Sequence, residues 1–194
     1  MTAETMEGRR PARARVLETA TRLFYAEGVH SVGIDRIIAE AGVAKATFYH
    51  HFPSKDDLVR AYVTEQSSWQ RAAAATMPAA SSRETLETVF TFMCDFGAGP
   101  GYRGCPFIYT AAEYPDPAHP VRQAIAEHRR WTRDLYRDLL AADGHPDAER
   151  TADILLLLRD GLSVSFDLDD PTAVRAAALE ALARLLGQTG AASS

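Results

Sequence analysis

Apolar residues recur at intervals of three and four along nearly the whole chain, and this spacing limits the possible folds more than any other feature of the sequence. In the first such segment Val16, Leu17, Ala20, Leu23 and Phe24 fall on one face of a helix. No segment sustains the alternation of apolar and polar residues that marks a half-buried strand. The sequence therefore predicts an all-α protein. About nine helices are expected, at residues 9–27, 34–41, 44–49, 55–75, 83–96, 105–114, 120–142, 148–166 and 171–186.

Cysteine content and hydropathy exclude two other classes of protein. The 194 residues include two cysteines, Cys94 and Cys105, too few for a secreted scaffold held by disulfides. The longest purely aliphatic run, Ile154–Leu158, is far shorter than the ~20 residues that span a bilayer. The polar segment Met1–Gly8 lacks the apolar core of a signal peptide. We therefore expect a soluble cytoplasmic protein with no membrane partner.

Charge is distributed unevenly between the front of the chain and the rest. The net charge is −5, which by itself disfavours binding to nucleic acid. Residues 1–55, however, hold eight basic and six acidic residues, whereas the remaining residues hold 13 and 20. Such a division accompanies a basic contact surface on an otherwise acidic protein. The asymmetry is small, so it supports a nucleic-acid partner only together with a motif.

A motif of that kind lies at about residues 34–52, where two short predicted helices flank a turn at Gly42. A short helix, a tight glycine-containing turn and a second short helix form the helix-turn-helix arrangement. Ile38, Val43 and Phe48 are expected to form the core beneath it. The second helix then presents side chains on a rod that fits the major groove of DNA. Its expected outward residues are Lys45, Ala46, Thr47, Tyr49 and His50.

The segment Gly42-Val-Ala-Lys-Ala-Thr-Phe-Tyr-His-His-Phe52, followed by Ser54, Lys55 and Leu58, closely resembles the tetracycline-repressor (TetR) family of transcription regulators. The resemblance covers about residues 9–60. It implies that Thr47 and Tyr49 contact phosphates and base edges, and that Lys45 contacts a phosphate or a base. It also implies that His50 reads bases at a variable position and that Lys55 holds the DNA backbone at the start of the fourth helix.

The sequence departs from the family's pattern at three positions. Ala44 replaces the usual serine, Ala46 replaces glycine, and Gly33 replaces the threonine or serine that caps the second helix. The changes at 44 and 33 each remove a hydroxyl group that would otherwise contact phosphate or cap a helix. We therefore do not count Ala44 among the expected DNA contacts.

Several residues around the motif also have a structural interpretation. Phe48 and Phe52 are expected in the core, and His51 in packing rather than at the DNA. Tyr49 is expected to contact DNA, with a half-buried strut as the alternative. Two interpretations stay open for a set of N-terminal arginines, which form either a solvated face or an arm that reaches the minor groove: Arg9, Arg10, Arg13 and Arg15.

No cofactor, metal or catalytic residue is expected. His50 and His51 are adjacent and so point about 100° apart on a helix, which prevents chelation of one ion. The glycine-rich segment 97–104 lacks the Gly-Lys-Ser/Thr ending of a phosphate-binding loop. Cys94 and Cys105 are expected to be small buried side chains, with a redox-sensing pair as the alternative.

The predicted domain organisation comprises a disordered tail at residues 1–8, a DNA-binding domain at 9–60 and a ligand-binding and dimerisation domain at 61–194. The helices at 148–166 and 171–186 are rich in leucine and alanine. The resemblance implies that they pair with their copies in a twofold homodimer, and closure of the monomer's own core is the alternative. The expected interface residues are Leu155, Leu156, Leu162, Leu182 and Leu185.

A ligand pocket in the second domain requires apolar and aromatic walls with a few polar groups. Each candidate wall residue has a position in the core as its alternative. Tyr114 is a further polar candidate. The expected wall residues are Phe90, Cys94, Phe107, Tyr109, Trp131, Leu135 and Phe166.

These expectations combine into one function. The chain is predicted to be a ligand-responsive, sequence-specific DNA-binding regulator that acts as a homodimer. We expect it to be a repressor that a small-molecule effector, which the sequence does not identify, releases from a palindromic operator in double-stranded DNA. The alternative from another class is a helical enzyme or small-molecule carrier that keeps the helix-turn-helix only as architecture.

Overall fold

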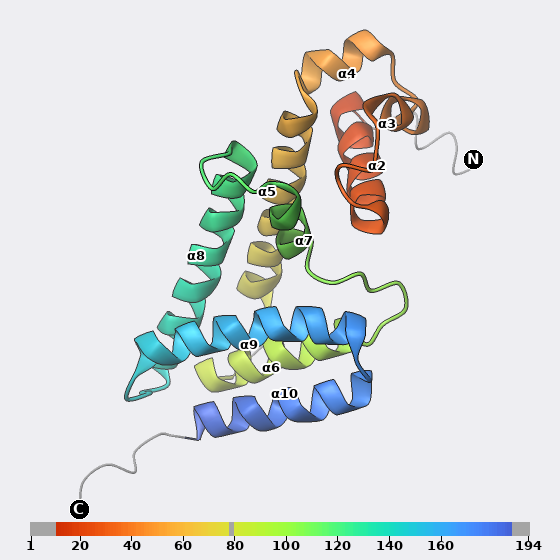
Figure 1. Ribbon diagram of the computed structural model, residues 1–194. Helices are drawn as coiled ribbons and strands as arrows, with labels where there is room; N and C mark the ends of the chain where they lie inside the picture. Colours follow the sequence, from red (N-terminus) through yellow and green to blue (C-terminus); the bar gives the residue numbers. More distant parts are fainter. Residues whose placement is uncertain (1–10, 78–79, 188–194) are drawn as a thin grey trace, which may run out of the picture. The chain divides into compact units, whose positions relative to one another are not determined.

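The computed structural model describes residues 11–77 and 80–187, and within these ranges the chain forms helices joined by turns, with no strand (Figure 1). The predicted all-α fold is confirmed. The predicted tail at residues 1–8, together with Arg9 and Arg10, lies outside the described residues. The helices of the described ranges are α2 (Ala12–Glu27), α3 (Ile34–Ala41), α4 (Lys45–His51), α5 (Lys55–Thr76), α6 (Ser82–Gly97), α7 (Pro106–Glu113), α8 (Pro120–Ala142), α9 (Ala148–Leu168) and α10 (Pro171–Leu186).

Local sequence signals set the ends of these helices. Gly42 ends α3 in the left-handed conformation, with φ of 61°, which a glycine adopts without steric cost. The Ser54 hydroxyl accepts a hydrogen bond from the backbone N–H of Asp57 and so caps α5. Asp147 and Asp170 cap α9 and α10 in the same way. These caps explain why the predicted boundaries lie close to the observed ones.

The chain forms two compact units whose boundary differs from the predicted one at residue 60. The first unit holds the described residues 11–68 and 109–125, and the second holds 69–77, 80–108 and 126–187. Residues 109–125, which the prediction assigned to the ligand-binding domain, thus belong with the helix-turn-helix. Helices α5, α7 and α8 each supply residues to both units.

In the first unit α2, α3 and α4 pack against one another. The predicted inner face of α2 is buried over its whole length, from Val16 to Phe24. The ring of Phe24 packs edge-on against that of Tyr62 of α5, with centroids 5.7 Å apart. Phe48 and Phe52 are both buried, as predicted. This core holds α4 by its inner side and leaves its outer side free.

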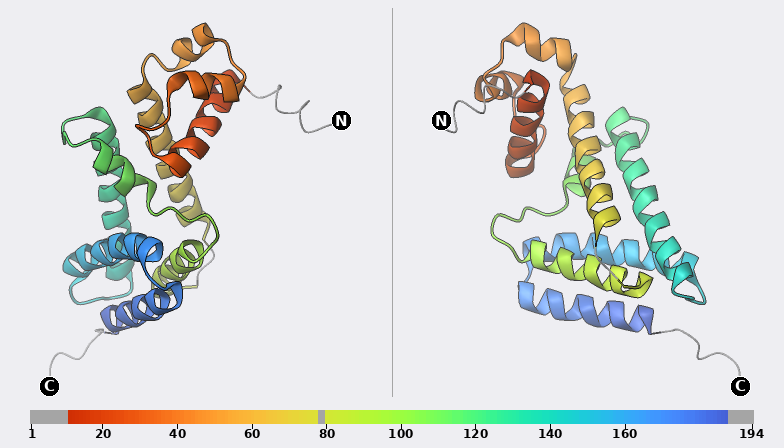
Figure 2. Two further views of the ribbon diagram at one scale, coloured as in Figure 1. Left: turned by 45° about the vertical axis from the view of Figure 1, so that its right-hand side comes forward. Right: turned by 180° about the vertical axis from the view of Figure 1, so that it is seen from behind.

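In the second unit α6, α9 and α10 pack against one another, and the views of Figure 2 show them side by side. Their shared core requires glycine at position 97. A Cβ atom there would lie 2.5 Å from the ring of Phe166, closer than any real contact. No helix of the described ranges is both long and apolar enough to span a membrane.

Candidate DNA-binding surface and ligand cavity

Helix α4 is anchored by one buried ring and turns its other side chains outward. Phe48 is completely buried, and successive residues of a helix are rotated by about 100°. Three residues therefore point away from Phe48, and all three are exposed: Ala46, Tyr49 and His50. Lys45, exposed, and Thr47, half-buried, flank them. The five residues predicted to face DNA thus form one surface on α4.

Lys45 and Lys55 are the only lysines of the chain, and both lie in the helix-turn-helix region. The Lys45 ammonium group lies 3.2 Å from Asp35, with both side chains largely exposed, so this ion pair is weak and exchanges readily for another anion. The Lys55 ammonium group donates to the carbonyl of His30 at 3.4 Å. Burial lowers the pKa of Lys55, against the opposing influence of Glu113 and Asp56.

The departures at Gly33 and Ala44 leave two helix N-termini without a side-chain cap. Both residues precede their helices in extended conformation, and neither α3 nor α4 receives a side-chain capping hydrogen bond. The first N–H groups of a helix have no partner within the helix. Phosphate oxygens of a bound duplex are suitable acceptors for such groups.

Two arginines of the basic N-terminal region are neutralised within the protein. Arg36 forms ion pairs with Glu27 at 2.6 Å and with Glu40 at 2.8 Å, and Arg22 pairs with Glu40 as well. Hydrogen bonds from these arginines lower the pKa of both carboxyl groups. The pairs connect α2 to α3. The local excess of positive charge counted from the sequence is therefore carried by other residues, among them the two lysines.

Arg13 and Arg15 make internal contacts that the sequence did not suggest. The Arg15 side chain donates to the carbonyl oxygens of Ala41 at 3.2 Å and Gly42 at 3.0 Å, at the C-terminus of α3, where the helix dipole favours a cation. The Arg13 guanidinium lies over the ring of Phe52, 5.2 Å from its centroid. Arg15 thus supports the turn between α3 and α4 from a helix 26 residues away in sequence.

Glu113 holds the turn between α2 and α3, and we call this set of contacts the Glu113 clamp. Its two carboxylate oxygens accept from the backbone N–H of Val29 at 2.8 Å and from that of His30, whose ring nitrogen Nδ1 lies 3.1 Å away. Next to it the Tyr114 hydroxyl donates to Asp56 of α5 at 2.9 Å. Burial and this hydrogen bond raise the pKa of Tyr114. The segment 109–125 therefore fixes both the α2–α3 turn and the start of α5.

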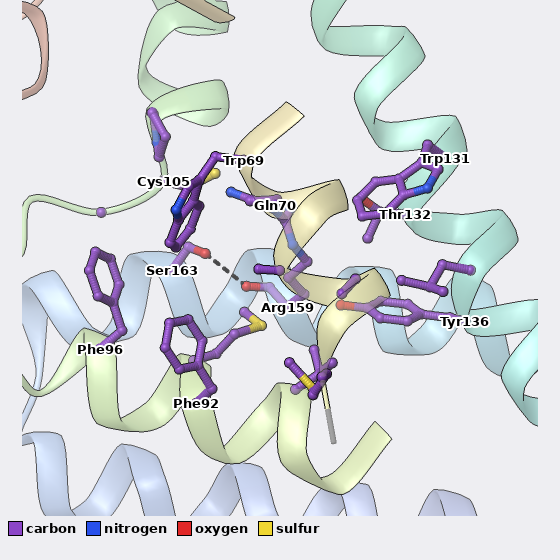
Figure 3. Close-up of a pocket in the computed structure, with 18 of the residues that line it drawn as sticks. Trp69, Gln70, Phe92, Phe96, Cys105, Trp131, Thr132, Tyr136, Arg159 and Ser163 are labelled. Atoms are coloured by element: carbon purple, nitrogen blue, oxygen red, sulfur yellow. Dashed lines mark hydrogen bonds between the residues drawn. The ribbon is translucent and has the colours of Figure 1, made fainter. Parts of the chain in front are cut away.

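The second unit contains a cavity of about 200 Å³, and Figure 3 shows the residues around it. Its walls come from α5, α6, α8, α9 and the segment that precedes α7. Most of the lining is apolar or aromatic, and the polar groups are few. The aromatic wall residues are Trp69, Phe92, Phe96, Tyr102, Trp131 and Tyr136, and the polar ones include Gln70, Thr132, Arg159 and Ser163.

The predicted wall residues are distributed between this cavity and other places. Trp131 and Leu135 line the cavity. Phe107 is buried and stacks on the ring of His128, with centroids 3.7 Å apart, and Tyr109 is exposed in the first unit, as Tyr114 is part of that unit too. Three others belong to the core between α6, α9 and α10: Phe90, Cys94 and Phe166.

The two cysteines lie in different surroundings. Cys105 is buried and lines the cavity, whereas Cys94 belongs to the core of the second unit. Burial raises the pKa of the Cys94 thiol, which disfavours the reactive thiolate. Both thiols are free in the structure.

Helix α9 exposes an apolar stripe, which we define as Ile154, Leu157, Gly161, Val164 and Leu168. These residues repeat at intervals of three and four, and the side chains of Leu157 and Leu168 are 69% and 73% exposed. The predicted interface residues lie elsewhere on the helices. Leu155, Leu162 and Leu182 are buried in the chain's own core, and Leu156 and Leu185 are half-buried.

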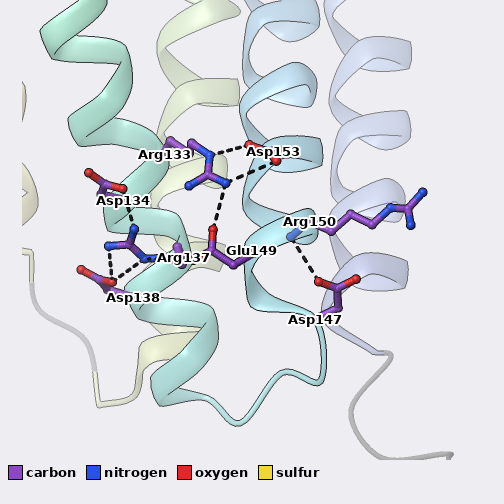
Figure 4. A network of polar contacts seen from close by, with 8 residues as sticks. All are labelled: Arg133, Asp134, Arg137, Asp138, Asp147, Glu149, Arg150 and Asp153. Carbon is purple, nitrogen blue, oxygen red and sulfur yellow. Dashed lines mark hydrogen bonds and ion pairs between the residues drawn. The ribbon is translucent and has the colours of Figure 1, made fainter.

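Polar contacts on the opposite side of α9 connect it to α8 (Figure 4). Arg133 of α8 pairs with Asp153 and, at 2.9 Å, with Glu149 of α9, while Arg137 pairs with Asp134 at 2.7 Å. Such exposed pairs each contribute little to stability. Within the described ranges no three His, Cys, Asp or Glu side chains gather in a way that would hold a metal ion.

Comparison with known proteins identifies the family. Residues 16–62 match the model for bacterial regulatory proteins of the tetR family. The crystal structure of SCO4454, a TetR-family transcriptional regulator from Streptomyces coelicolor, is 44% identical, with a TM-score of 0.82, over 91% of this chain and 94% of that one. This chain belongs to the TetR family.

Two further relatives agree with this assignment. The transcriptional regulator LmrA of Bacillus subtilis is 27% identical to this TetR-family protein over 169 residues, which cover 83% of this chain and 89% of LmrA. The crystal structure of the regulator sav143 from Streptomyces avermitilis is 29% identical, with a TM-score of 0.80, and covers 92% of this chain and 99% of that one. The predicted function as a helix-turn-helix transcriptional regulator is thus confirmed.

Proposed function

We propose that this TetR-family regulator is a homodimeric repressor that leaves a palindromic operator when a small molecule occupies the cavity of its second unit. The observation that carries the proposal is the pairing, in one chain, of a firmly anchored recognition helix with a cavity of about 200 Å³ walled by aromatic side chains. The ligand acts by binding one conformation of the dimer more tightly than another, because only differential affinity shifts such an equilibrium.

Dimerisation is supported by the apolar stripe on α9. A heptad-like repeat of exposed apolar residues is typical of a helix that packs against another helix. Gly161 in the middle of the stripe has open space where a side chain would stand, so a partner helix has room to approach closely. Helix α10 adds exposed alanines on neighbouring positions, Ala173, Ala176 and Ala177. A twofold dimer through these helices presents two copies of α4 to two matched half-sites.

The two lysines are expected to neutralise DNA phosphates. Replacing Lys55 or Lys45 by alanine should weaken binding to all duplexes alike, because phosphate contacts do not depend on sequence. In a plot of log K against log salt concentration, the slope should become shallower by about one for each phosphate that a monomer no longer neutralises. The measurement is a fluorescence-anisotropy titration between 50 and 300 mM salt, values chosen to cover roughly the range in which such slopes are resolved.

Arg184→Ala serves as the control for charge alone. Arg184 is exposed on α10, where it pairs with Glu180, and its loss removes the same unit of charge from the second unit. The slope should stay at its wild-type value in that variant. An unchanged slope in the Lys55 and Lys45 variants would show that neither side chain contacts phosphate.

His50 is expected to carry more of the sequence discrimination than Thr47 or Tyr49. It is exposed on α4, and its ring offers one donor and one acceptor nitrogen at a reach suited to base edges. In His50→Ala the preference at one base pair of each half-site should fall by about 1–3 kcal/mol. Tyr49→Phe should instead weaken binding with little change of preference. Selection of sites from a random pool of duplexes, with each variant, measures both effects.

The same selection tests the proposed function as a whole. The wild-type protein should enrich a near-palindrome with two half-sites, because its twofold symmetry demands matched sequences. Enrichment of unrelated sequences, or of none, would contradict the proposal. Identical sequence preferences for wild type and His50→Ala would assign base reading to other residues of α4.

A further inference from the structure

The cavity has the size and the walls of a site for a flat apolar molecule. An engineered protein cavity of about 150 Å³ holds benzene, so a cavity of 200 Å³ accommodates one ring with substituents or two fused rings. Trp69, Phe92 and Phe96 line it and are also about half exposed, at 55%, 48% and 53%. Aromatic side chains that are both exposed and part of a cavity offer ring faces for stacking to a ligand that enters from solvent.

Most polar groups of the cavity are already engaged within the protein. The Ser163 hydroxyl donates to the carbonyl of Arg159 at 3.0 Å, the contact drawn in Figure 3, and the Thr132 hydroxyl donates to the carbonyl of His128 at 3.0 Å. A hydroxyl carries one proton, so neither group has a further donor for a ligand. The remaining strong donors on the walls are the guanidinium of Arg159 and the amide of Gln70.

Arg159 is a buried cation whose acid partner is shared. Its side chain is only 6% exposed. Among the described residues the carboxylate that it contacts is that of Asp160, at 3.4 Å, and the other oxygen of that carboxylate lies 2.7 Å from Arg129. Two guanidinium groups therefore share one carboxylate. A buried charge that lacks a full counter-charge is costly, and an anion supplied by a ligand relieves that cost.

The neighbouring histidine reinforces this excess of positive charge. His128 is buried, and its Nε2 lies 3.5 Å from the Arg159 guanidinium. Burial, together with the charges of Arg159, Arg71 and Arg129, lowers the pKa of His128 to about 3. The ring is therefore neutral at physiological pH and accepts from Arg159 without cancelling its charge. The guanidinium keeps its positive charge at the edge of an otherwise apolar cavity.

We propose that the effector of this regulator is a flat aromatic acid of one or two rings, whose carboxylate pairs with Arg159 and whose rings lie among the aromatic walls of the cavity. This inference rests on the proposed function, in which the cavity is the effector site. Arginine is suited to the role because its planar guanidinium matches a carboxylate with two parallel hydrogen bonds. An aromatic cage alone would equally suit a cation, but the charge of Arg159 opposes one.

Three probes of one shape and different charge test the proposal on the full-length protein. They are 2-naphthoate, 2-naphthalenemethanol and 2-naphthylmethylammonium, titrated by isothermal calorimetry. Wild type should bind the acid at least tenfold more tightly than the alcohol, and the ammonium compound least. Arg159→Met, which keeps length without charge, should remove the preference for the acid. Arg150→Met, on the exposed side of the same helix, should keep it.

The outcomes separate the failure of this inference from that of the proposed function. Equal affinity for acid and alcohol, tighter binding of the ammonium compound, or no binding of any probe by wild type would each overturn the inference, whatever the protein does with DNA. If Arg159→Met does not fold, the wild-type series still decides, and Arg159→Lys should show a reduced preference for the acid. Binding of the acid to a protein that selects no palindrome would instead contradict the proposed repressor function.

Discussion

Replacing Leu157 by arginine is expected to convert the dimer into monomers and to lower operator affinity by more than 100-fold. Leu157 lies at the centre of the apolar stripe and is more than two-thirds exposed in the single chain. Burying a leucine stabilises an interface by roughly 1.5–3 kcal/mol, and a twofold axis counts each residue twice. A buried unpaired charge instead costs several kcal/mol. Sedimentation velocity and gel shift on one operator measure the two effects.

Two variants control for effects other than loss of the interface. Leu157→Met keeps an apolar side chain of similar volume and should remain a dimer. Ala75→Arg places the same charge on an exposed position of α5, outside the stripe. Arginine at Leu156 or Leu185 is a less direct test, because both side chains are half-buried and border the chain's own core. A native-like dimer of Leu157→Arg would place the interface on another face.

Replacing Glu113 by alanine is expected to destabilise the first unit by about 1–3 kcal/mol, the cost of leaving a buried donor without an acceptor. The donor concerned is the backbone N–H of Val29, a residue that is almost completely buried. Amide hydrogen exchange at Val29 and His30 should accelerate by roughly tenfold to a hundredfold, since 1.4 kcal/mol corresponds to a factor of ten. Operator affinity should fall with it, because the α2–α3 turn positions the helix-turn-helix.

Two matched variants locate the effect in the Glu113 clamp. Glu113→Gln keeps one carbonyl acceptor, so its exchange rates should lie between those of wild type and the alanine variant. Glu127→Ala removes an exposed glutamate from α8 and should leave exchange at both amides unchanged. Wild-type protection of Val29 in Glu113→Ala would mean that the turn is held by its own residues.

The helix boundaries and the recognition surface were predictable because their causes are local. Gly42 adopts a conformation that few other residues tolerate, and Ser54 and Asp170 cap the helices that follow them. The buried position of Phe48 then determines which residues of α4 face outward. Each of these signals lies within a few residues of the feature that it causes.

The cavity, the apolar stripe and the clamp depend on contacts between distant residues, and periodicity does not report them. Ile154–Leu158 is apolar on every side, so the sequence does not distinguish the buried Leu155 from the exposed Leu157. Phe90 and Trp131 both satisfy a helical apolar pattern, yet one enters the core and the other a cavity wall. Glu113 and Val29 are 84 positions apart. Their pairing follows only from the path of the chain.

The membership of residues 109–125 in the first unit bears on how regulators of this kind are recombined. A reader domain cut at residue 68 would lose the acceptor of the Val29 amide and the Tyr114 hydroxyl that binds Asp56. Fusion of residues 1–68 to a foreign sensor domain therefore creates a chimera with an incomplete α2–α3 turn. Chimeras that also carry over residues 109–125, or that transplant Glu113 and Tyr114 into the matching segment of the sensor, keep the reader intact. The transferable module in this protein is a discontinuous one.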